Sequence, residues 1–408
     1  ARLNSNLYRL KGVFPSVGYK RFYPQKESHA HIIGYISDIT KDEYKENPFS
    51  KLNNAKSGKI GIEKSLDDDL RGRLGSKSIE INAYGREIRE LKKIEGREGK
   101  NIQLTIDSDV QNFCFNQLKG LSGSISVIEV NSGDYIALTS APAFDPNKFS
   151  NGISLNDWNE LLNNKYKPLI NKSISSFYPP GSTIKPLVAL AALEVGISPN
   201  ETFSCNGKHE VEDSSMETGI KTFHCWKKDG HKEVNMNEAI KASCDVYFYQ
   251  IARRVGIDKI AEVCRRFGLG KDVFDLFYEE QPGIVPDKKW KQKTLGRGWL
   301  IGETLVSAIG QSYFLSTSSQ LSLAFAQIVN GGKLISPNLI YRNKARDIKI
   351  PTLLAAQSHL KILRKALDDA TNKPGGTSYR SRILGKNKMA GKTGTSQVRA
   401  ISEQEREE

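Results

Sequence analysis

The stretch YPPGSTIKP, Tyr178–Pro186, decides how this part of the chain folds, because a sharp break is followed at once by a helix pattern. Two prolines and a glycine at 179–181 do not fit inside a helix, whereas Ser182 can begin one. The run STIKPLVALAALEVG has apolar residues at helical spacing, which predicts a core helix that ends near Gly196. Pro186 falls in the first turn, where proline is tolerated.

Ser182 and Lys185 are three residues apart, so both side chains project from one face of the predicted helix. A serine hydroxyl needs a base to become a good nucleophile, and a lysine amine that has lost its proton can serve. The helix N-terminus adds amide donors for a developing oxyanion. The same spacing also arises from an N-capping serine with an unrelated lysine, so other motifs must decide.

Two further polar motifs follow in the chain. KASCDVYFYQ, 241–250, places Ser243 and Asp245 as a polar pair. AGKTGTSQV, 390–398, predicts an edge strand that can offer an amide to an oxyanion, and it contains Lys392, Thr393, Gly394 and Thr395. Lys392 can supply positive charge for a substrate carboxylate. The patterns S-x-x-K, S-x-D and K-T-G, in this order, together indicate a serine acyl-transfer site.

The five cysteines fall into two groups. Two lie in apolar helical patterns, which predicts buried hydrophobic side chains at Cys114 and Cys264. The other three share the segment between the first and second motifs with His209, His224 and His231. The segment predicts a structural zinc site held by Cys205, Cys225, His231 and Cys244. His209 is the rival for the fourth position, and a Cys205–Cys225 disulfide is the alternative to a metal.

The pattern outside the motifs predicts an α+β fold with an antiparallel sheet. Residues 101–106, NIQLTI, alternate like a strand, and Asp107 can cap a helix that runs to about Leu118. Residues 124–141 form two β-rich runs around a turn, which indicates a hairpin. A helix is expected over Thr317–Gly331, with Thr317 and its third neighbour as a capping box, and a late strand near Lys392.

Composition separates two parts and limits the partners. Residues 1–101 are irregular, charge-rich and contain only short strand-like pieces such as 78–82, whereas 102–408 carries the motifs. The 408-residue chain has a mean hydropathy of −0.47, and no apolar run approaches the roughly 18 residues of a membrane helix. The net charge of +14 fits a solvated basic surface or attraction to an anionic surface or polymer. Nucleic acid is not expected as a partner, because no nucleic-acid-binding motif is present.

At this point the sequence resembles the penicillin-binding protein and serine β-lactamase superfamily. GIEKSLDDDLRG, LTID and YPPGSTIKP together resemble class B penicillin-binding proteins. RFYPQKESHAHIIGY, FHCWKKDGH, SCDVYFYQIA, PDKKWKQK and AIGQSYF resemble the elongation-type branch, penicillin-binding protein 2. The resemblance covers nearly the whole chain. It implies a transpeptidase domain of helices around an antiparallel sheet, with a β-rich, non-catalytic N-terminal pedestal of the dimerisation type.

The resemblance implies a function and a role for each motif. The function would be peptidoglycan D,D-transpeptidation during cell elongation, on the periplasmic side of the bacterial cytoplasmic membrane, with β-lactams as inhibitors. By motif, Ser182 is the acylated nucleophile, Lys185 its base and Ser243 a proton relay for the leaving group. Asp245 stands where the wider superfamily has asparagine, and its role stays open.

The third motif would bind the substrate. The resemblance implies that Lys392 and Thr393 line the side of the substrate carboxylate. The amides of Ser182 and Thr395 would form the oxyanion hole. In the family further strands and a helix follow this motif, so we expect the C-terminal strands of the sheet to be missing here.

Partners and alternative functions follow from the same resemblance. Expected partners are stem peptides, β-lactams, a membrane glycosyltransferase and a rod-shape scaffold protein, with 1–101 as the docking part and a membrane anchor outside this sequence. A serine β-lactamase or β-lactam sensor is an alternative, which the N-terminal region and the lack of an evident deacylating glutamate disfavour. A cell-wall scaffold without turnover is the other alternative.

Overall fold

The computed structural model divides the chain into two compact units, Ala1–Lys100 with Ala143–Leu169, and Asn101–Pro142 with Ile170–Glu408. It describes residues 20–40, 55–84, 87–150, 152–212, 219–341, 351–353 and 355–396, together with Arg9 and Glu43. The first unit therefore includes 143–169, which the sequence analysis had placed in the second domain. Among the residues described, no helix combines the length and the apolar content needed to cross a bilayer.

The first unit consists of short helices and two hairpins. Its elements are η2 (Lys26–His29), α1 (Ala30–Ile33), β1 (Ile36–Asp38), β2 (Lys56–Gly58), α2 (Gly61–Ser65), α3 (Asp67–Arg71), β3 (Ser76–Ile81), β4 (Glu87–Ile94), α5 (Pro146–Ser150) and α6 (Leu155–Asn163). β1 pairs with β2 and β3 with β4, both antiparallel. A small core forms around Ala30, Phe144 and Phe149, with Tyr35 stacked on Phe149 at 4.1 Å.

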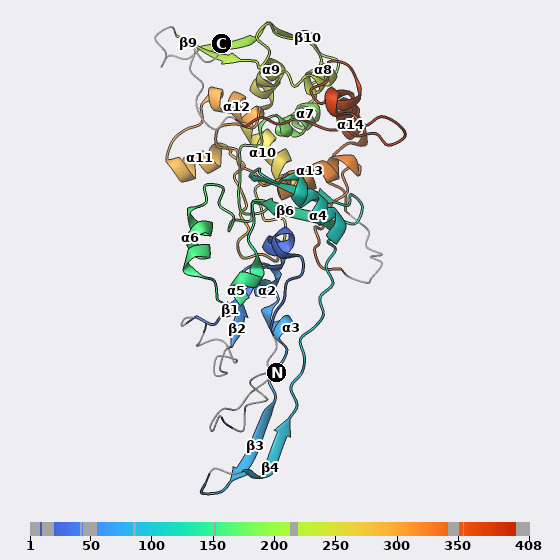
Figure 1. Cartoon of the computed structure of the whole chain (residues 1–408). Coiled ribbons are helices and arrows are strands. Elements are labelled where there is room, and N and C mark those ends of the chain that lie inside the picture. The colour runs from blue at the N-terminus through green and yellow to red at the C-terminus, as the bar shows by residue number, and fades with distance from the viewer. Residues whose placement is uncertain are drawn as a thin grey trace. The chain divides into compact units, whose positions relative to one another are not determined.

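The β3–β4 hairpin is a two-stranded ribbon (Figure 1), and its apolar side chains are exposed. Ile81, Ile88 and Leu91 are all more than half exposed. Two register shifts, between Ser78 and Ile79 and between Glu80 and Ile81, interrupt the pairing. The strand expected over 78–82 is thus part of this hairpin.

The second unit is mainly helical. Its elements are α4 (Ser108–Gln117), β5 (Gly123–Ile128), β6 (Tyr135–Ala141), η4 (Gly181–Ile184), α7 (Lys185–Glu194), β7 (Phe203–Cys205), β8 (Lys208–Glu212), β9 (Ile220–His224), β10 (Lys232–Val234), α8 (Met236–Lys241), α9 (Asp245–Val255), α10 (Ile257–Arg266), α11 (Lys288–Leu295), α12 (Ile301–Ala308), α13 (Ser318–Val329), α14 (Gln357–Asn372) and η5 (Tyr379–Ser381). β5 and β6 form an antiparallel hairpin; α4 packs on β6 and α13 on β5. This arrangement confirms the α+β class.

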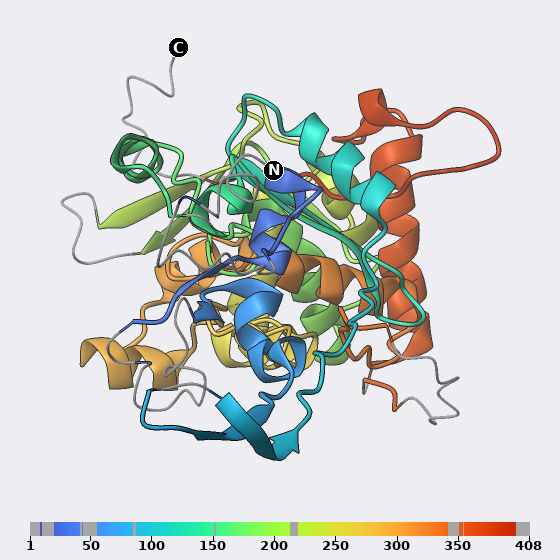
Figure 2. The ribbon, with the colours of Figure 1, turned by 60° about the horizontal axis from the view of Figure 1, so that its bottom comes forward.

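Helix α7 is the centre of the main core. Every residue from Lys185 to Leu193 is buried, because the helix is apolar around its whole circumference. It packs against α9, α10 and α14. Figure 1 shows these helices around α7, and Figure 2 shows α14 as the long red helix of this unit.

Several predicted elements are confirmed. Asp107 caps α4 by accepting hydrogen bonds from the amides of the second and third following residues. The predicted hairpin is β5–β6, and α13 has the expected capping box between Thr317 and Gln320. Cys114 and Cys264 are buried.

Two strand predictions are wrong. Residues 101–106 make one isolated antiparallel bridge, from Leu104 to Ile340, and residues 390–396 form no strand. A strand requires a neighbour that pairs with successive backbone groups. Around the K-T-G motif the backbone instead makes single contacts. The Gly391 amide donates to the Leu367 carbonyl, and the Thr395 carbonyl accepts from the Gln311 side chain.

The burial of α7 leads to a stability prediction. Leu190→Ala should lower the free energy of unfolding by about 3 kcal/mol, because Leu190 is fully buried and its loss leaves a cavity. Urea unfolding measures the effect. Leu121→Ala is the control, since Leu121 is 59% exposed and should change stability by less than about 0.5 kcal/mol. Equal effects of the two substitutions would contradict the assignment of α7 as the core.

Candidate active site

Ser182 lies in a single 3-10 turn, η4, immediately before α7, and it is half-buried. Gly181 holds the turn with φ +56°, a conformation that favours glycine. A Cβ atom on Gly181 would lie 2.3 Å from the Thr395 carbonyl oxygen, so only glycine lets the K-T-G segment approach this closely. Gly394 also sits close, because its Cβ would lie 2.7 Å from Cγ2 of Thr183. The first and third motifs are therefore neighbours.

Lys185 is the first residue of α7 and is fully buried. Its Nζ donates to Asp245 Oδ1 at 2.7 Å, to the Ser243 carbonyl at 2.8 Å and to Ser243 Oγ at 3.2 Å. The ring of Phe248 lies 5.2 Å from the amine. Three donated hydrogen bonds use all three protons of an ammonium group, so this arrangement corresponds to charged Lys185. Lys185 must therefore release a proton before it can act as a base.

The second motif is held in an unusual backbone conformation. Ser243 is buried and has φ +56°, which is uncommon for a residue with a side chain and is often found at functional sites. The next residue, Cys244, is the N-cap of α9 and accepts a hydrogen bond from the Tyr247 amide. The Ser243 carbonyl and hydroxyl both lie within hydrogen-bond distance of the Lys185 amine.

Asp245 is the counter-ion of Lys185. Its Oδ1 pairs with the Lys185 amine, and its Oδ2 accepts the Trp226 backbone amide at 2.9 Å. Both carboxylate oxygens are thus bonded. Asp245, whose role the sequence left open, is thus the ion-pair partner of Lys185 in this structure.

Lys392 reaches the same hydroxyl from the opposite motif. Its Nζ donates to Ser243 Oγ at 2.8 Å and to the Thr393 carbonyl at 3.0 Å. Burial, and next the nearby charge of Lys185, lower the pKa of Lys392 to about 7, while Asp245 opposes the change. The Ser243 hydroxyl therefore lies between two amines, those of Lys185 and Lys392.

The predicted site residues come together as one polar cluster. Lys185, Ser243, Asp245 and Lys392 are joined by hydrogen bonds, and Thr395 reaches the Ser182 turn through Gly181. Thr393 is exposed, and its hydroxyl donates to Thr377 Oγ1 at 2.9 Å. Two amines face one carboxylate, so the site favours an anionic substrate group.

Three contact residues were not singled out from the sequence. They are Trp226, Gln311 and Thr377, which bond to Asp245, Thr395 and Thr393 respectively. Two of them lie inside stretches that carry the family resemblance, FHCWKKDGH and AIGQSYF. The presence of these two residues in the family-like stretches is the sequence signal that could have identified them.

The four predicted metal ligands form a second cluster beside the site. The ligand atoms of Cys205, Cys225, His231 and Cys244 all lie within 4.8 Å of one another. His231 Nδ1 is 3.5 Å from the Cys225 sulfur and 3.7 Å from the Cys205 sulfur. All five cysteines are free, so the Cys205–Cys225 disulfide is not formed. His209 is outside the cluster and stacks on Tyr249.

Two cysteines of the cluster change each other's acidity. A hydrogen bond with Cys244 lowers the pKa of the Cys225 thiol and raises that of Cys244. A thiolate is thereby favoured at Cys225 in a buried position. Three sulfurs and one imidazole nitrogen are a donor set that suits zinc in a closed, structural site.

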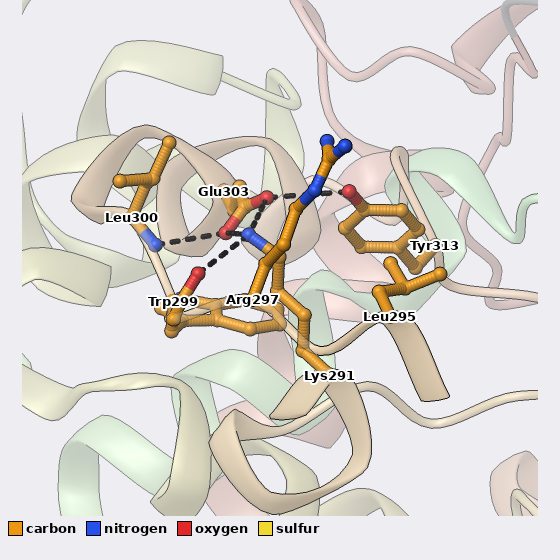
Figure 3. A pocket seen from close by; sticks show the side chains of 8 residues that line it. Lys291, Leu295, Arg297, Trp299, Leu300, Glu303 and Tyr313 are labelled. Atoms are coloured by element: carbon orange, nitrogen blue, oxygen red, sulfur yellow. Dashed lines mark hydrogen bonds and ion pairs between the residues drawn. The ribbon is translucent and has the colours of Figure 1, made fainter. Parts of the chain in front are cut away.

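The cavity in Figure 3 lies away from these residues, between α11 and α12. It has a volume of about 650 Å³, and Lys291, Trp299, Glu303 and Tyr313 are among the residues that line it. The Glu303 carboxylate accepts hydrogen bonds from Lys291, from the Leu300 amide and from the Tyr313 hydroxyl. The Glu303 carboxylate is therefore engaged in hydrogen bonds within the protein, and these bonds stabilise the wall of the surface cavity.

Comparison with protein families gives the class. Residues 123–408 match the penicillin binding protein transpeptidase domain, and residues 1–104 match the penicillin-binding protein dimerisation domain. The chain therefore belongs to the penicillin-binding proteins.

The relatives narrow the class to the penicillin-binding protein 2 branch, as the sequence predicted. The chain is 34% identical to the peptidoglycan D,D-transpeptidase MrdA of Escherichia coli strain K12, over 98% of its own length and 64% of that protein. It thus spans somewhat less than two thirds of that relative.

Two solved structures are similar over nearly the whole chain. Penicillin-binding protein 2 of Helicobacter pylori, in complex with MreC, has a TM-score of 0.89 and 32% identity, covering 97% of this chain and 72% of that one. Penicillin-binding protein 2 of Pseudomonas aeruginosa, in complex with WCK 5153, has a TM-score of 0.82 and 31% identity, covering 94% and 81%.

The lowered pKa of Lys392 gives a pH prediction. The unfolded chain carries an ordinary lysine with a pKa of about 10.4 and so binds more protons than the folded chain above about pH 7. The folded state therefore gains stability as pH rises through this window. Relative to Lys392→Met, the wild-type chain should gain about 2 kcal/mol of unfolding free energy between about pH 7 and about pH 9.

Urea unfolding at several pH values measures this difference. Lys388→Met is the matched control, because Lys388 is an exposed lysine four residues away, and it should follow the wild-type profile. Parallel profiles for Lys392→Met and wild type would show that Lys392 keeps its proton in the folded chain.

Proposed function

We propose that this chain carries the catalytic part of a peptidoglycan D,D-transpeptidase that cross-links stem peptides during cell elongation. The observation that supports this most is the set of hydrogen bonds from Lys185 through Ser243 to Lys392, beside Ser182. The catalytic motifs, the matched transpeptidase domain and the MrdA relative agree with it.

The acyl transfer would proceed through the Ser182 hydroxyl. Ser182 Oγ bonds to the substrate carbonyl carbon, the peptide C–N bond breaks, and the terminal residue leaves as an amine. Lys185 takes the serine proton, and Ser243 relays this proton to the leaving nitrogen. An acceptor amine then attacks the acyl carbon, the ester C–O bond breaks, and the proton that the amine loses passes through Lys185 to the Ser182 oxygen.

Lys392 would prepare Lys185 for this role. Lys392 has a pKa of about 7 in the chain without substrate. A bound substrate carboxylate would favour the charged form of Lys392. A proton passed from Lys185 through Ser243 Oγ to Lys392 would leave Lys185 as a neutral base. The 3.2 Å and 2.8 Å contacts to Ser243 Oγ support this route.

Location and partners belong to the same proposal. We infer a catalytic domain on the periplasmic side of the cytoplasmic membrane, held there by an anchor. Residues 1–101 would be the docking part for a membrane glycosyltransferase and a rod-shape scaffold protein. The complex of the Helicobacter pylori relative with MreC supports a scaffold partner.

The β-lactamase alternative is less well supported. Hydrolysis of an acyl-enzyme needs a base for water, and Asp245 is the acid that the described contacts bring into this site. Both its oxygens are already bonded, to Lys185 and to the Trp226 amide. A slow-turnover acyl-enzyme is therefore expected.

A fluorescent penicillin tests the function. Wild-type chain should form a long-lived adduct at Ser182 alone, located by mass spectrometry of a digest. Ser182→Ala should abolish the adduct and lower stability by no more than about 1 kcal/mol, because Ser182 is only half-buried and caps neither η4 nor α7. Rapid decay of the adduct would indicate a β-lactamase, and no adduct would indicate a scaffold. A label on another serine would refute the nucleophile.

We also propose that Cys205, Cys225, His231 and Cys244 hold one structural zinc ion. Their mutual distances and burial support this, since three sulfurs and an imidazole suit zinc better than calcium or magnesium. The ion would take no part in the reaction. It would fix Cys244, which lies between Ser243 and Asp245.

Elemental analysis of protein purified without added metal should find one zinc per chain. Cys225→Ser should lose the zinc and lower the melting temperature, because structural zinc contributes to folding free energy. Cys264→Ser is the matched control: this buried cysteine is outside the cluster, so its variant should retain the zinc. Zinc well below one equivalent, with a Cys205–Cys225 disulfide in a non-reduced digest, would rule the site out.

A further inference from the structure

Trp226 joins the Cys/His cluster to the second catalytic motif. It follows Cys225 directly, and its ring lies edge-on to the His231 ring at 5.4 Å. Its indole N–H lies 3.1 Å from both the Ala242 and the Ser243 carbonyl oxygens. Its backbone amide donates to Asp245 Oδ2 at 2.9 Å.

Two residues of the second motif, Ser243 and Asp245, accept hydrogen bonds both from Trp226 and from Lys185. The amine of Lys185 and the indole N–H share the Ser243 carbonyl, and the amine and the Trp226 amide take the two oxygens of Asp245. A carbonyl or carboxylate bonded on two sides is fixed in orientation more strongly than one bonded on a single side. Ser243 needs such support, because its left-handed backbone conformation is maintained by its surroundings.

We propose that Trp226 is a positioning residue for the acyl transfer, which holds the Ser243 carbonyl and the Asp245 carboxylate in the orientation that Lys185 requires. This inference rests on the proposed transpeptidase function. Trp226 acts through Ser243 and Asp245 and needs no contact with the substrate. A different role, in which the ring only covers the Cys/His cluster, predicts that any loss of rate is accompanied by loss of metal.

The exposure of Trp226 makes the test feasible. The side chain is 59% exposed, so Trp226→Phe leaves no buried cavity and should fold. Replacing the indole by benzothiophene, with β-(3-benzothienyl)alanine at position 226, keeps the ring shape and removes only the N–H donor. Trp299→Phe is the matched control, because it also loses an indole hydrogen bond, to Thr304 Oγ1 at 2.8 Å, but not one to the second motif.

The full chain is treated with a fluorescent penicillin, and stopped-flow kinetics separate the acylation rate constant from the affinity of the initial complex. Both position-226 variants should acylate about tenfold more slowly, the factor expected for one lost hydrogen bond at a reacting centre. The affinity should change less than about twofold, and the zinc content and melting temperature should match wild type. Trp299→Phe should acylate at the wild-type rate.

Other results overturn the proposal. A wild-type acylation rate in the benzothiophene variant would show that the indole N–H is not used. A slower rate accompanied by loss of zinc would assign the ring to the cluster instead. A wild-type chain that forms no adduct would refute the proposed function itself. The acylation rate of wild type, measured first, therefore separates failure of the proposed function from failure of the proposal for Trp226.

Discussion

A buried lysine ammonium is the constraint on which the second unit depends. Lys185 starts a helix that is apolar from Pro186 to Leu193, and it has no exposed surface. A charge at this depth costs several kcal/mol unless an anion and further acceptors surround it. Asp245 and Ser243 supply them, so the N-terminus of α9 must lie against the N-terminus of α7. The same requirement explains the left-handed backbone at Ser243, because both its carbonyl and its hydroxyl accept from one amine.

The neighbouring groups reinforce this arrangement from the other side. The Trp226 amide donates to the second oxygen of Asp245, and Cys244 is part of the Cys/His cluster. The second motif is therefore held by α7 on one side and by the β7–β10 segment on the other. Lys392 adds a second amine next to a single carboxylate, and its burial, followed by the charge of Lys185, lowers its pKa to about 7. A substrate carboxylate would restore the balance of charge.

What the sequence predicted well was local. The spacing of Ser182 and Lys185 suggested a site only together with the second and third motifs, whereas the hairpin and the capping box follow from residues close together in the chain. The choice between Cys205 and His209 could not be made locally, because it depends on strand pairing. Cys205 pairs with Lys232 and so lies beside His231, whereas His209 pairs with Phe223 in another hairpin.

Contacts between residues far apart in the sequence explain the other differences between the predictions and the structure. Asp245 and Lys185 are 60 residues apart, so no pattern in the sequence shows that they form an ion pair. The strands expected over 101–106 and near Lys392 have suitable residues but lack a neighbour that pairs with them continuously. Trp226 lies in a stretch that resembles the family, but nothing in the sequence around an exposed tryptophan predicts its contact with the Ser243 carbonyl.

The first and third motifs are brought together by backbone contacts, which limits how the site can vary. The Gly181 amide donates to the Gly310 carbonyl at 2.9 Å, and a Cβ on Gly310 would lie 2.2 Å from the Gly181 carbonyl oxygen. On its other side, Gly181 meets the Thr395 carbonyl, which Gln311 also binds. A side chain at Gly181 or Gly310 would push these backbone segments apart. The position of the Thr395 amide relative to Ser182 therefore depends on the absence of two Cβ atoms as much as on any polar residue.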